Sequence, residues 1–290
     1  MTFSISGISR LTARAGAALA GLAAATGAMA ADIPGQPVDK AIDFQPGVTQ
    51  IRADQIFFYN WILSPIIIAV AGFILLLLAI VILRFNKRAN PEPARFSHNT
   101  PIEILWTVVP VLILMFIAIF SFRLLFEEHH MPTPDMTVKV TGRQWNWDYE
   151  YPDQKISAYT STPMDEGVAK AKNLPYLLET NAPMIVPVGK VVRVQVTAED
   201  VIHSWSVPAF GVKIDAVPGR LNQVWFKADK TGVFYGQCSQ LCGINHSYMP
   251  IEVKVVSQPE FDAWVASKQP KTASVAAAAP APGAATTSAR

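Results

Sequence analysis

The sequence contains few cysteines and few charged residues. Its 290 residues include 2 Cys, and only 16% are charged, whereas 51% are hydrophobic. Two cysteines cannot form a disulfide framework, and no Cys-x-x-Cys-His heme attachment motif is present. A net charge of +2 gives no general basis for binding nucleic acid. The hydrophobic excess lies before residue 126, which indicates membrane helices rather than a larger soluble core.

The N-terminus has the features of a secretory signal peptide. Arg10 and Arg14 precede a run of small apolar residues, and Ala28-Met29-Ala30 is a suitable cleavage site. The alternative is a short first transmembrane helix, but the run is rich in Ala and Gly and too short to span a bilayer. We therefore expect residues 1–30 to be removed, leaving residues 31–56 as a periplasmic N-terminal segment.

Two long uncharged stretches follow, Trp61 to Leu83 and Ile104 to Phe122. At about 1.5 Å per helical residue the first covers roughly 35 Å, enough to cross the hydrocarbon core. The pattern predicts a hairpin over residues 57–126, with helices at about 57–83 and 102–126. The loop between them is basic, which places it in the cytoplasm. Its charged residues are Arg84, Lys87, Arg88 and Arg95, against a single Glu92.

This topology predicts a multi-pass protein of the bacterial inner membrane with both long ends in the periplasm.

From about Thr137 the pattern changes to short alternating runs separated by Pro and Gly, which predicts an antiparallel β-sandwich over residues 135–268. Residues 259–268 are typical of a short closing helix. The tail 269–290 is rich in Ala and Pro and is predicted to be disordered. The strand-like runs are 138–140, 191–196, 223–226 and 251–255.

Metal-binding side chains gather near the end of the sandwich. Cys238, Cys242, His246 and Met249 share one short segment, and His203 follows a strand-like run upstream. The thiols alone would suit a disulfide in an oxidising compartment, or a structural zinc with the imidazoles. A thioether, however, favours copper over zinc, and a mononuclear blue copper site leaves one Cys unexplained. Two metals sharing bridging sulfurs fit the donor set better.

Several segments resemble cytochrome c oxidase subunit II, and the resemblance covers roughly residues 50–265. The segment 238–249 is similar to the dinuclear copper A loop of that family. The other matching segments are Glu199 to Pro208, Ile214 to Gln223 and Tyr235 to Cys238. The resemblance implies a cupredoxin-like, Greek-key sandwich outside the membrane, joined to the helical hairpin.

The resemblance also implies the role of each ligand. Cys238 and Cys242 would bridge two copper ions. His203 and Met249 would complete one copper, and His246 and the backbone carbonyl of Gln240 the other. The family usually has Glu at position 240, whose side chain binds a nearby magnesium ion. An amide is a weaker ligand for a hard cation, so this departure puts the magnesium site in question and leaves the copper site intact.

By the same resemblance the chain accepts electrons from reduced cytochrome c and passes them to heme in subunit I, where oxygen is reduced and protons are moved. Trp145 would receive the incoming electron, and Glu103 would lie at the mouth of a proton pathway. Each also has a structural interpretation, as a packed strand aromatic and a helix-start carboxylate. Asp215 and Arg220 match residues at the subunit border. Acids that could steer a basic cytochrome c are Asp148, Glu150, Asp153 and Asp200.

Three other functions share part of this pattern. A quinol oxidase subunit lacks the copper ligands, and a nitrous oxide reductase carries the loop on a large propeller. A membrane-anchored copper chaperone would need neither the aromatic segment nor the subunit-border segment. His129 and His130 also suggest a metal site, but we expect an exposed juxtamembrane cluster because no other ligand converges there.

Overall fold

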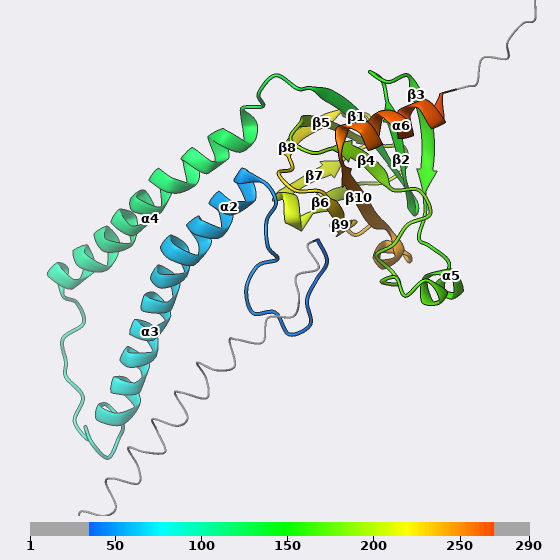
Figure 1. The fold of residues 1–290 in the computed structure, drawn as a ribbon. Helices are drawn as coiled ribbons and strands as arrows, with labels where there is room; N and C mark the ends of the chain where they lie inside the picture. The colour runs from blue at the N-terminus through cyan, green and yellow to red at the C-terminus, as the bar shows by residue number, and fades with distance from the viewer. Residues whose placement is uncertain (1–34, 270–290) are drawn as a thin grey trace, which may run out of the picture.

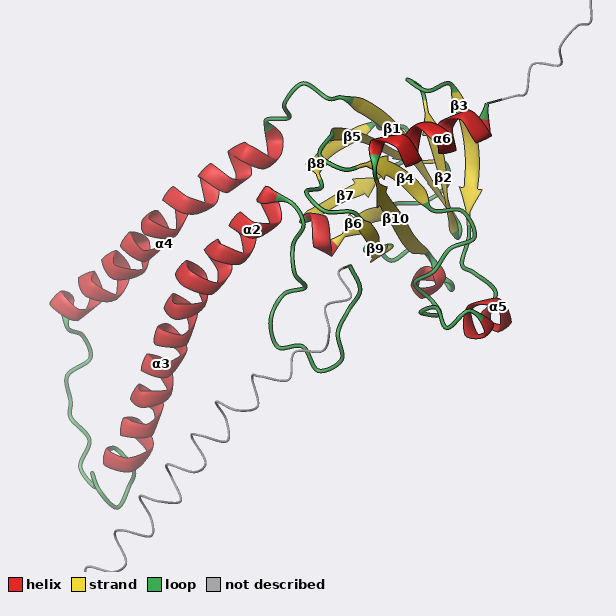
Figure 2. Ribbon diagram, in the orientation of Figure 1, coloured by secondary structure: helices red, strands yellow, loops and turns green. Residues whose placement is uncertain are grey.

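The structure is a computed structural model that describes residues 35–269. The predicted signal peptide and most of the predicted disordered tail therefore lie outside the described residues. Two long helices lie side by side at one end of the chain and lead into a domain made mainly of strands (Figures 1 and 2). This arrangement confirms the predicted hairpin followed by an all-β domain.

The first long helix is continuous from Gln50 to Arg84 but changes its winding on the way. It consists of α2 (Gln50–Phe57), a π-helical segment η2 (Phe58–Leu63) and α3 (Ser64–Arg84). The second long helix is α4 (Thr100–His129). Their 35 and 30 residues correspond to about 52 and 45 Å, so both exceed the hydrocarbon core of roughly 30 Å. Both helices begin earlier than predicted because caps at Thr49 and Asn99 satisfy their first amides.

The strands form three sheets. The largest has the spatial order β3 (Ile156–Ser161), β2 (Asn146–Tyr151), β1 (Met136–Arg143), β5 (Val191–Ala198) and β8 (Asn222–Lys227). A second has the order β4 (Met184–Pro187), β10 (Pro250–Val256) and β9 (Gly232–Gln237), and a hairpin joins β6 (His203–Val207) to β7 (Val212–Ala216). The remaining elements are η3 (Pro208–Phe210), η4 (His246–Tyr248), α5 (Glu166–Ala171) and α6 (Gln258–Lys268).

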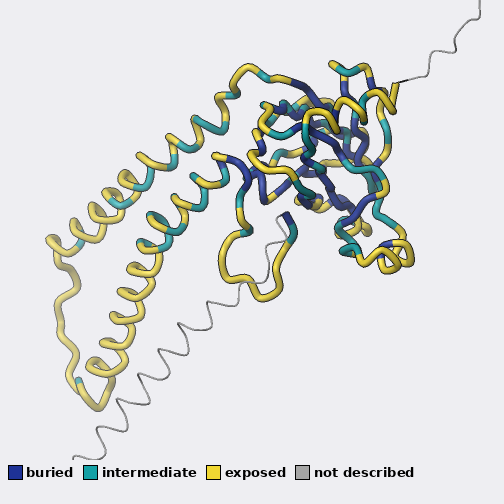
Figure 3. Tube along the Cα trace, viewed as in Figure 1, coloured by how far each residue is buried: buried dark blue, intermediate teal, exposed yellow. Residues whose placement is uncertain are grey.

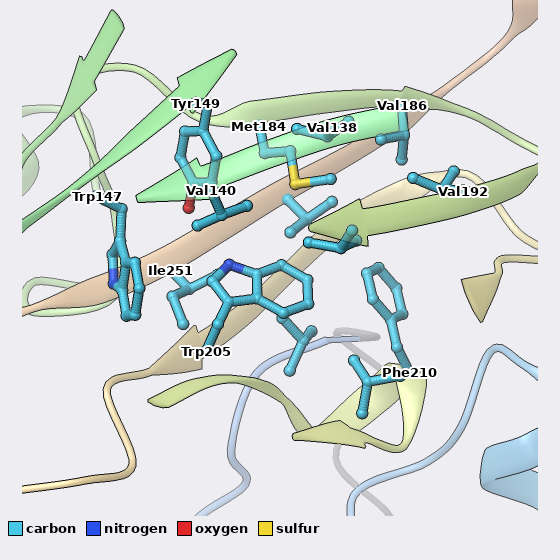
Figure 4. Packing of buried hydrophobic residues seen from close by; sticks show 14 of the residues in the cluster. Val138, Val140, Trp147, Tyr149, Met184, Val186, Val192, Trp205, Phe210 and Ile251 are labelled. Atoms are coloured by element: carbon cyan, nitrogen blue, oxygen red, sulfur yellow. The ribbon is translucent and has the colours of Figure 1, made fainter. Parts of the chain in front are cut away.

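The sequence predicted an antiparallel sandwich, but two of the strand pairs are parallel. β1 pairs with β5 in parallel, and β10 pairs with β4 in parallel. Both pairs join strands that are distant in sequence, so alternation within each strand gave no sign of their direction. Side chains from facing sheets fill the core (Figure 4). The largest fully buried ones include Trp147, Trp205, Tyr149, Phe210 and Ile251.

The segment before α2 is attached to the β-domain rather than free. The amide of Val48 donates to the carbonyl of Ala209 (3.0 Å), and the amide of Asp229 donates to the carbonyl of Val48 (2.8 Å). The hydroxyl of Thr49 donates to the carbonyl of Phe210 (2.8 Å). The helices are thereby fixed to the domain that carries the candidate site.

A second junction joins the far end of α4 to the same domain. The side-chain amide of Gln55 donates to Glu128 Oε1 and to the carbonyl of Gly211, each at 2.8 Å. The indole of Trp225 donates to the carbonyl of Glu128 (3.1 Å). Residues become more exposed along the hairpin away from this junction (Figure 3). No residue of α3 or α4 is buried within the chain, which is expected for surfaces that face lipid or other subunits.

Candidate metal centre

The candidate metal centre lies between the start of β6 and the loop that connects β9 to β10. His203 is the first residue of β6, Cys238 follows β9, and Met249 immediately precedes β10. Ser239 donates its amide to the carbonyl of Ser204 (3.0 Å), which holds the loop against β6. The ligand atoms of His203, Cys238 and Cys242 all lie within 4.8 Å of one another. The fold therefore brings the distant imidazole to the two thiols.

Several donor atoms lie close to the two thiols. Cys238 Sγ lies 3.8 Å from Cys242 Sγ and 4.0 Å from His203 Nδ1. Cys242 Sγ lies 3.6 Å from His246 Nδ1, and Cys238 Sγ lies 3.3 Å from the carbonyl oxygen of Gln240. The carbonyl at position 240 thus points towards the thiols. Met249 is almost fully buried at this site, and its carbonyl accepts from the amide of Cys238 (3.1 Å).

Both cysteines are free and buried. Their sulfur separation of 3.8 Å is well beyond the roughly 2.05 Å of a disulfide bond. Two soft sulfurs, two imidazoles, a buried thioether and a backbone carbonyl form a donor set suited to copper. Such a set exceeds the four ligands of a structural zinc site.

His203 is oriented by groups behind it. Its Nε2 donates to Asp200 Oδ1 (2.9 Å), which leaves Nδ1 directed towards the thiols. Gly142 packs directly against the ring, since a Cβ at that position would lie 2.9 Å from His203 Cδ2. The ring of Trp147 contacts His203 edge to face, with centroids 5.9 Å apart. The imidazole is thus held on three sides by groups of the chain itself.

Trp145 is linked to the metal loop by a hydrogen bond. Its indole Nε1 donates to the carbonyl of Cys242 (3.2 Å), and the side chain of Gln144 donates to the same oxygen (2.8 Å). Asp200 Oδ2 accepts from the amide of Gln144 (2.7 Å). Asp200 therefore connects His203 to the segment that carries Trp145. Sequence reasoning missed this role, although its position three residues before His203 was a usable signal.

The two thiols differ in acidity. Burial raises the pKa of Cys238, but hydrogen bonds involving His203 and the backbone at Gln240 and Ser204 outweigh it and lower the pKa. Burial and the neighbouring charge of Cys238 raise the pKa of Cys242. The pair therefore loses its first proton easily and its second with difficulty, as expected for two coupled groups. A bound cation would favour loss of both protons.

The four proposed steering acids all make contacts within the chain. Asp148 pairs with Arg143 (3.1 Å), Glu150 pairs with Lys139 (3.2 Å), and Asp153 accepts from the amide of Thr137 (2.7 Å). Asp200 binds His203 and Gln144 as described. Asp148 is the least accessible, with only 10% of its side chain exposed.

The remaining candidate residues lie away from the metal centre. Glu103, in the first turn of α4, accepts from the amide of Asn99 (3.3 Å), an interaction that stabilises the helix start. His129 and His130 are exposed, and each ring Nδ1 contacts a carbonyl one turn earlier in α4. Neither joins a cluster of metal-binding side chains within residues 35–269.

The chain matches two descriptions of one protein family. Residues 136–256 match the periplasmic domain of cytochrome c oxidase subunit II, and residues 37–124 match its transmembrane domain. Together these matches cover most of the chain, and both the hairpin and the β-domain fall within them. They also support the cupredoxin-like fold expected from the resemblance.

Individual relatives carry the same name. Cytochrome c oxidase subunit 2 of Cereibacter sphaeroides is 47% identical over 266 residues, covering 85% of this chain and 88% of that protein. A probable cytochrome c oxidase subunit 2 of Rickettsia felis is 46% identical over 241 residues, covering 82% of this chain and 75% of that one. The solved periplasmic domain of subunit II from Bradyrhizobium japonicum is 52% identical, with a TM-score of 0.45, and covers 48% of this chain and 96% of that one.

Proposed function

Because this chain belongs to the cytochrome c oxidase subunit II family, we propose that it carries electrons from reduced cytochrome c to heme in subunit I. It is a membrane-anchored part of a heme-copper oxidase, and oxygen reduction takes place in the partner. The observation that carries the proposal is the meeting of His203 with the two thiols at one end of the β-domain.

The residues present fit a dinuclear copper centre. Cys238 and Cys242 would supply two thiolates to the pair of ions. His203 and Met249 would complete the ligands of one copper, and His246 and the carbonyl of Gln240 would complete those of the other. The paired coppers, when bound, supply a one-electron carrier. The chain's own residues shield four of the donor side chains from water, since Cys238, Cys242, His203 and Met249 are all buried.

We assign the first contact with the electron to Trp145. Its hydrogen bond to the carbonyl of Cys242 gives a short link between a half-buried indole and a copper ligand.

Four acidic residues contribute to an electric field that attracts a basic electron donor, although each also makes a contact within the chain. They are Asp148, Glu150, Asp153 and Asp200. Asp215 and Arg220 are structural or electron-relay candidates at the border with the heme-bearing subunit, and in this proposal the β-domain lies in the periplasm.

Two further roles complete the proposal. Glu103 lies at the entrance of a proton pathway, at the end of the hairpin away from the β-domain. An ionisable group at the membrane boundary can pass protons inward there. Gln240 supplies its carbonyl, and because its neutral amide is a weak ligand for a hard cation, we assign no magnesium site to its side chain. The signal peptide at residues 1–30 is removed during export.

Metal stoichiometry of the soluble domain from Asp135 onward tests the proposal. We expect two coppers per chain, with near-infrared absorption and an electron paramagnetic resonance signal shared over both ions. Met249→Leu should keep the fold and change the spectrum, because it removes a soft ligand without removing apolar volume. Binding of one copper, or of zinc alone, would contradict the proposal and favour a chaperone role.

A further inference from the structure

A small groove lies between the two long helices, at the end nearest the β-domain. There α2 and η2 contact α4, while the rest of the hairpin diverges (Figure 1). The groove has a volume of about 170 Å³ and a polar upper wall formed by Asp54, Arg123 and Glu127. The rest of its lining is apolar and consists of Phe57, Phe58, Ile62, Phe120 and Leu124.

The depth of this groove matches the lipid headgroup layer. Asp54 is the last charged residue before the uncharged run of the first helix, and Arg123 is the first charged residue after that of α4. Both therefore lie at the outer boundary of the apolar helix segments, and Glu127 lies about 6 Å further along α4. The headgroup layer occupies roughly 5–8 Å on each side of the core. The polar wall therefore lies among headgroups and the apolar wall among the first carbons of the acyl chains.

The charges of the polar wall are of both signs and only partly paired. Arg123 Nε lies 3.0 Å from Glu127 Oε1, and 82% of the Arg123 side chain remains exposed. Asp54 accepts from the neutral side chain of Gln50 (3.0 Å) and makes no ion pair within residues 35–269. A guanidinium can bind a phosphate through its remaining donors, and the two carboxylates can accept hydrogen bonds from an ammonium group.

The π-helical segment is an independent feature of the same groove. The amide of Ser64 donates to the carbonyl of Tyr59, five residues earlier, instead of four. Phe58 and Ile62 from this segment line the groove. Single π-turns inside α-helices are rare and are frequently found at functional sites. The irregular winding thus coincides with the groove rather than with the fully exposed part of the helix.

We propose that this groove binds the headgroup of one phosphatidylethanolamine molecule. Its phosphate lies against Arg123, and its ammonium group lies between Asp54 and Glu127. The groove is smaller than the 300–1,000 Å³ typical of sites for drug-sized ligands, so only the headgroup enters and the acyl chains follow the exposed apolar helix faces. A choline headgroup has no N–H donor for the carboxylates, and an anionic headgroup meets two carboxylates against one cation.

Lipid retention by the assembled oxidase tests this site. The purified complex is exchanged into defined lipid and the bound molecules are counted by native mass spectrometry. We expect one more phosphatidylethanolamine than phosphatidylcholine or phosphatidylglycerol to be retained. Arg123→Gln and Asp54→Asn should each weaken that retention about 10-fold or more, because each removes a charge-assisted hydrogen bond. Copper content should stay unchanged in both variants.

Lys87→Gln is the matched control, because it removes a juxtamembrane cation at the other end of the hairpin, outside the groove. It should retain phosphatidylethanolamine like the unsubstituted complex. Equal retention of the ethanolamine and choline lipids, or unchanged retention in both groove variants, would overturn the proposal. So would the absence of the extra lipid from the unsubstituted complex, which would mean that another subunit covers the groove.

Discussion

The orientation of His203 depends on one carboxylate. Asp200 binds its Nε2 and also the amide of Gln144, so the same side chain positions a ligand and the neighbouring indole segment. Replacing a group that holds a metal-bound imidazole in this way typically costs 10–100-fold in metal affinity. Asp200→Asn should therefore weaken copper binding by about that factor, measured by competition with a chelator. Glu150→Gln, which removes a charge without contacting a ligand, should have little effect; equal losses in both would contradict the positioning role.

Gly142 controls the space behind the same ring. A methyl group there would lie 2.9 Å from His203 Cδ2 and 3.1 Å from Trp147 Cζ3. Both rings are fully buried and cannot move away freely. Gly142→Ala should shift the imidazole and destabilise the domain by about 1–3 kcal/mol. Copper content of the purified oxidase measures the first effect, with Gly72→Ala as the control, because a methyl group there meets nothing within 4 Å.

A buried carboxylate away from the metal gives a pH dependence to stability. Glu252 accepts from the amide and hydroxyl of Thr180 (2.7 and 2.9 Å) and lies 3.2 Å from Lys254 Nζ. Burial raises its pKa above 4.5 despite these partners, and nearby Glu179 adds to the rise. The folded state therefore keeps a proton that the unfolded chain releases, and stability falls as pH rises from 4.5 through the folded pKa.

Glu252→Gln should remove this fall and make the domain more stable at neutral pH. Urea midpoints of the soluble domain measured across a pH series would show it. Glu166→Gln is the control, because its carboxylate is exposed on α5. A pH slope that is the same in the Glu252 variant as in the original domain would show that other groups set it.

At the scale of elements, α2 depends on a cap that also joins it to the β-domain. Thr49 accepts from the amide of Arg52 and donates to the carbonyl of Phe210. Thr49→Ala removes both bonds and should cost about 1–2 kcal/mol locally. Amide exchange in residues 50–53 should accelerate roughly 5–30-fold in the full chain. Asn99→Ala, which removes a cap without a domain contact, should affect only the start of α4.

Sequence patterns predicted those elements whose signal is local. The uncharged stretches gave both membrane helices, and alternation gave parts of β1, β5, β8 and β10. The closing helix was predicted one residue short, because Ser257 and Glu260 form a capping box at its start. The parallel direction of β1 against β5 could not be predicted, because it depends on pairing between distant strands.

The candidate site was predictable for a different reason. Cys238, Cys242, His246 and Met249 are metal-binding residue types gathered in one loop, so the sequence pattern indicated them, whereas the carbonyl of Gln240 was implied only by the family resemblance. What composition could not give is how their neighbours are used. Asp148 and Asp200 were proposed as steering acids, and only the fold reveals their contacts with Arg143 and His203. The π-turn at Phe58 also has no distinct sequence signal within an apolar run.

At the scale of the whole molecule, attraction of the donor should depend on salt. Glu150 retains 38% side-chain exposure beside Lys139, whereas Asp148 retains 10%. Glu150→Gln should therefore slow association with cytochrome c several-fold at low ionic strength and little at high ionic strength. Stopped-flow reduction of the complex measures the rate. Asp262→Asn is the control, because α6 follows the end of β10 opposite the metal loop; an equal effect there would show that only total charge matters.

The separation of His203 from Cys238 by 35 positions has a consequence for biogenesis. The loop donors lie close together in the chain, whereas the imidazole reaches them only through the packing of β6 against β9. We therefore expect a partly folded subunit to bind copper weakly, and tight binding to require the completed domain.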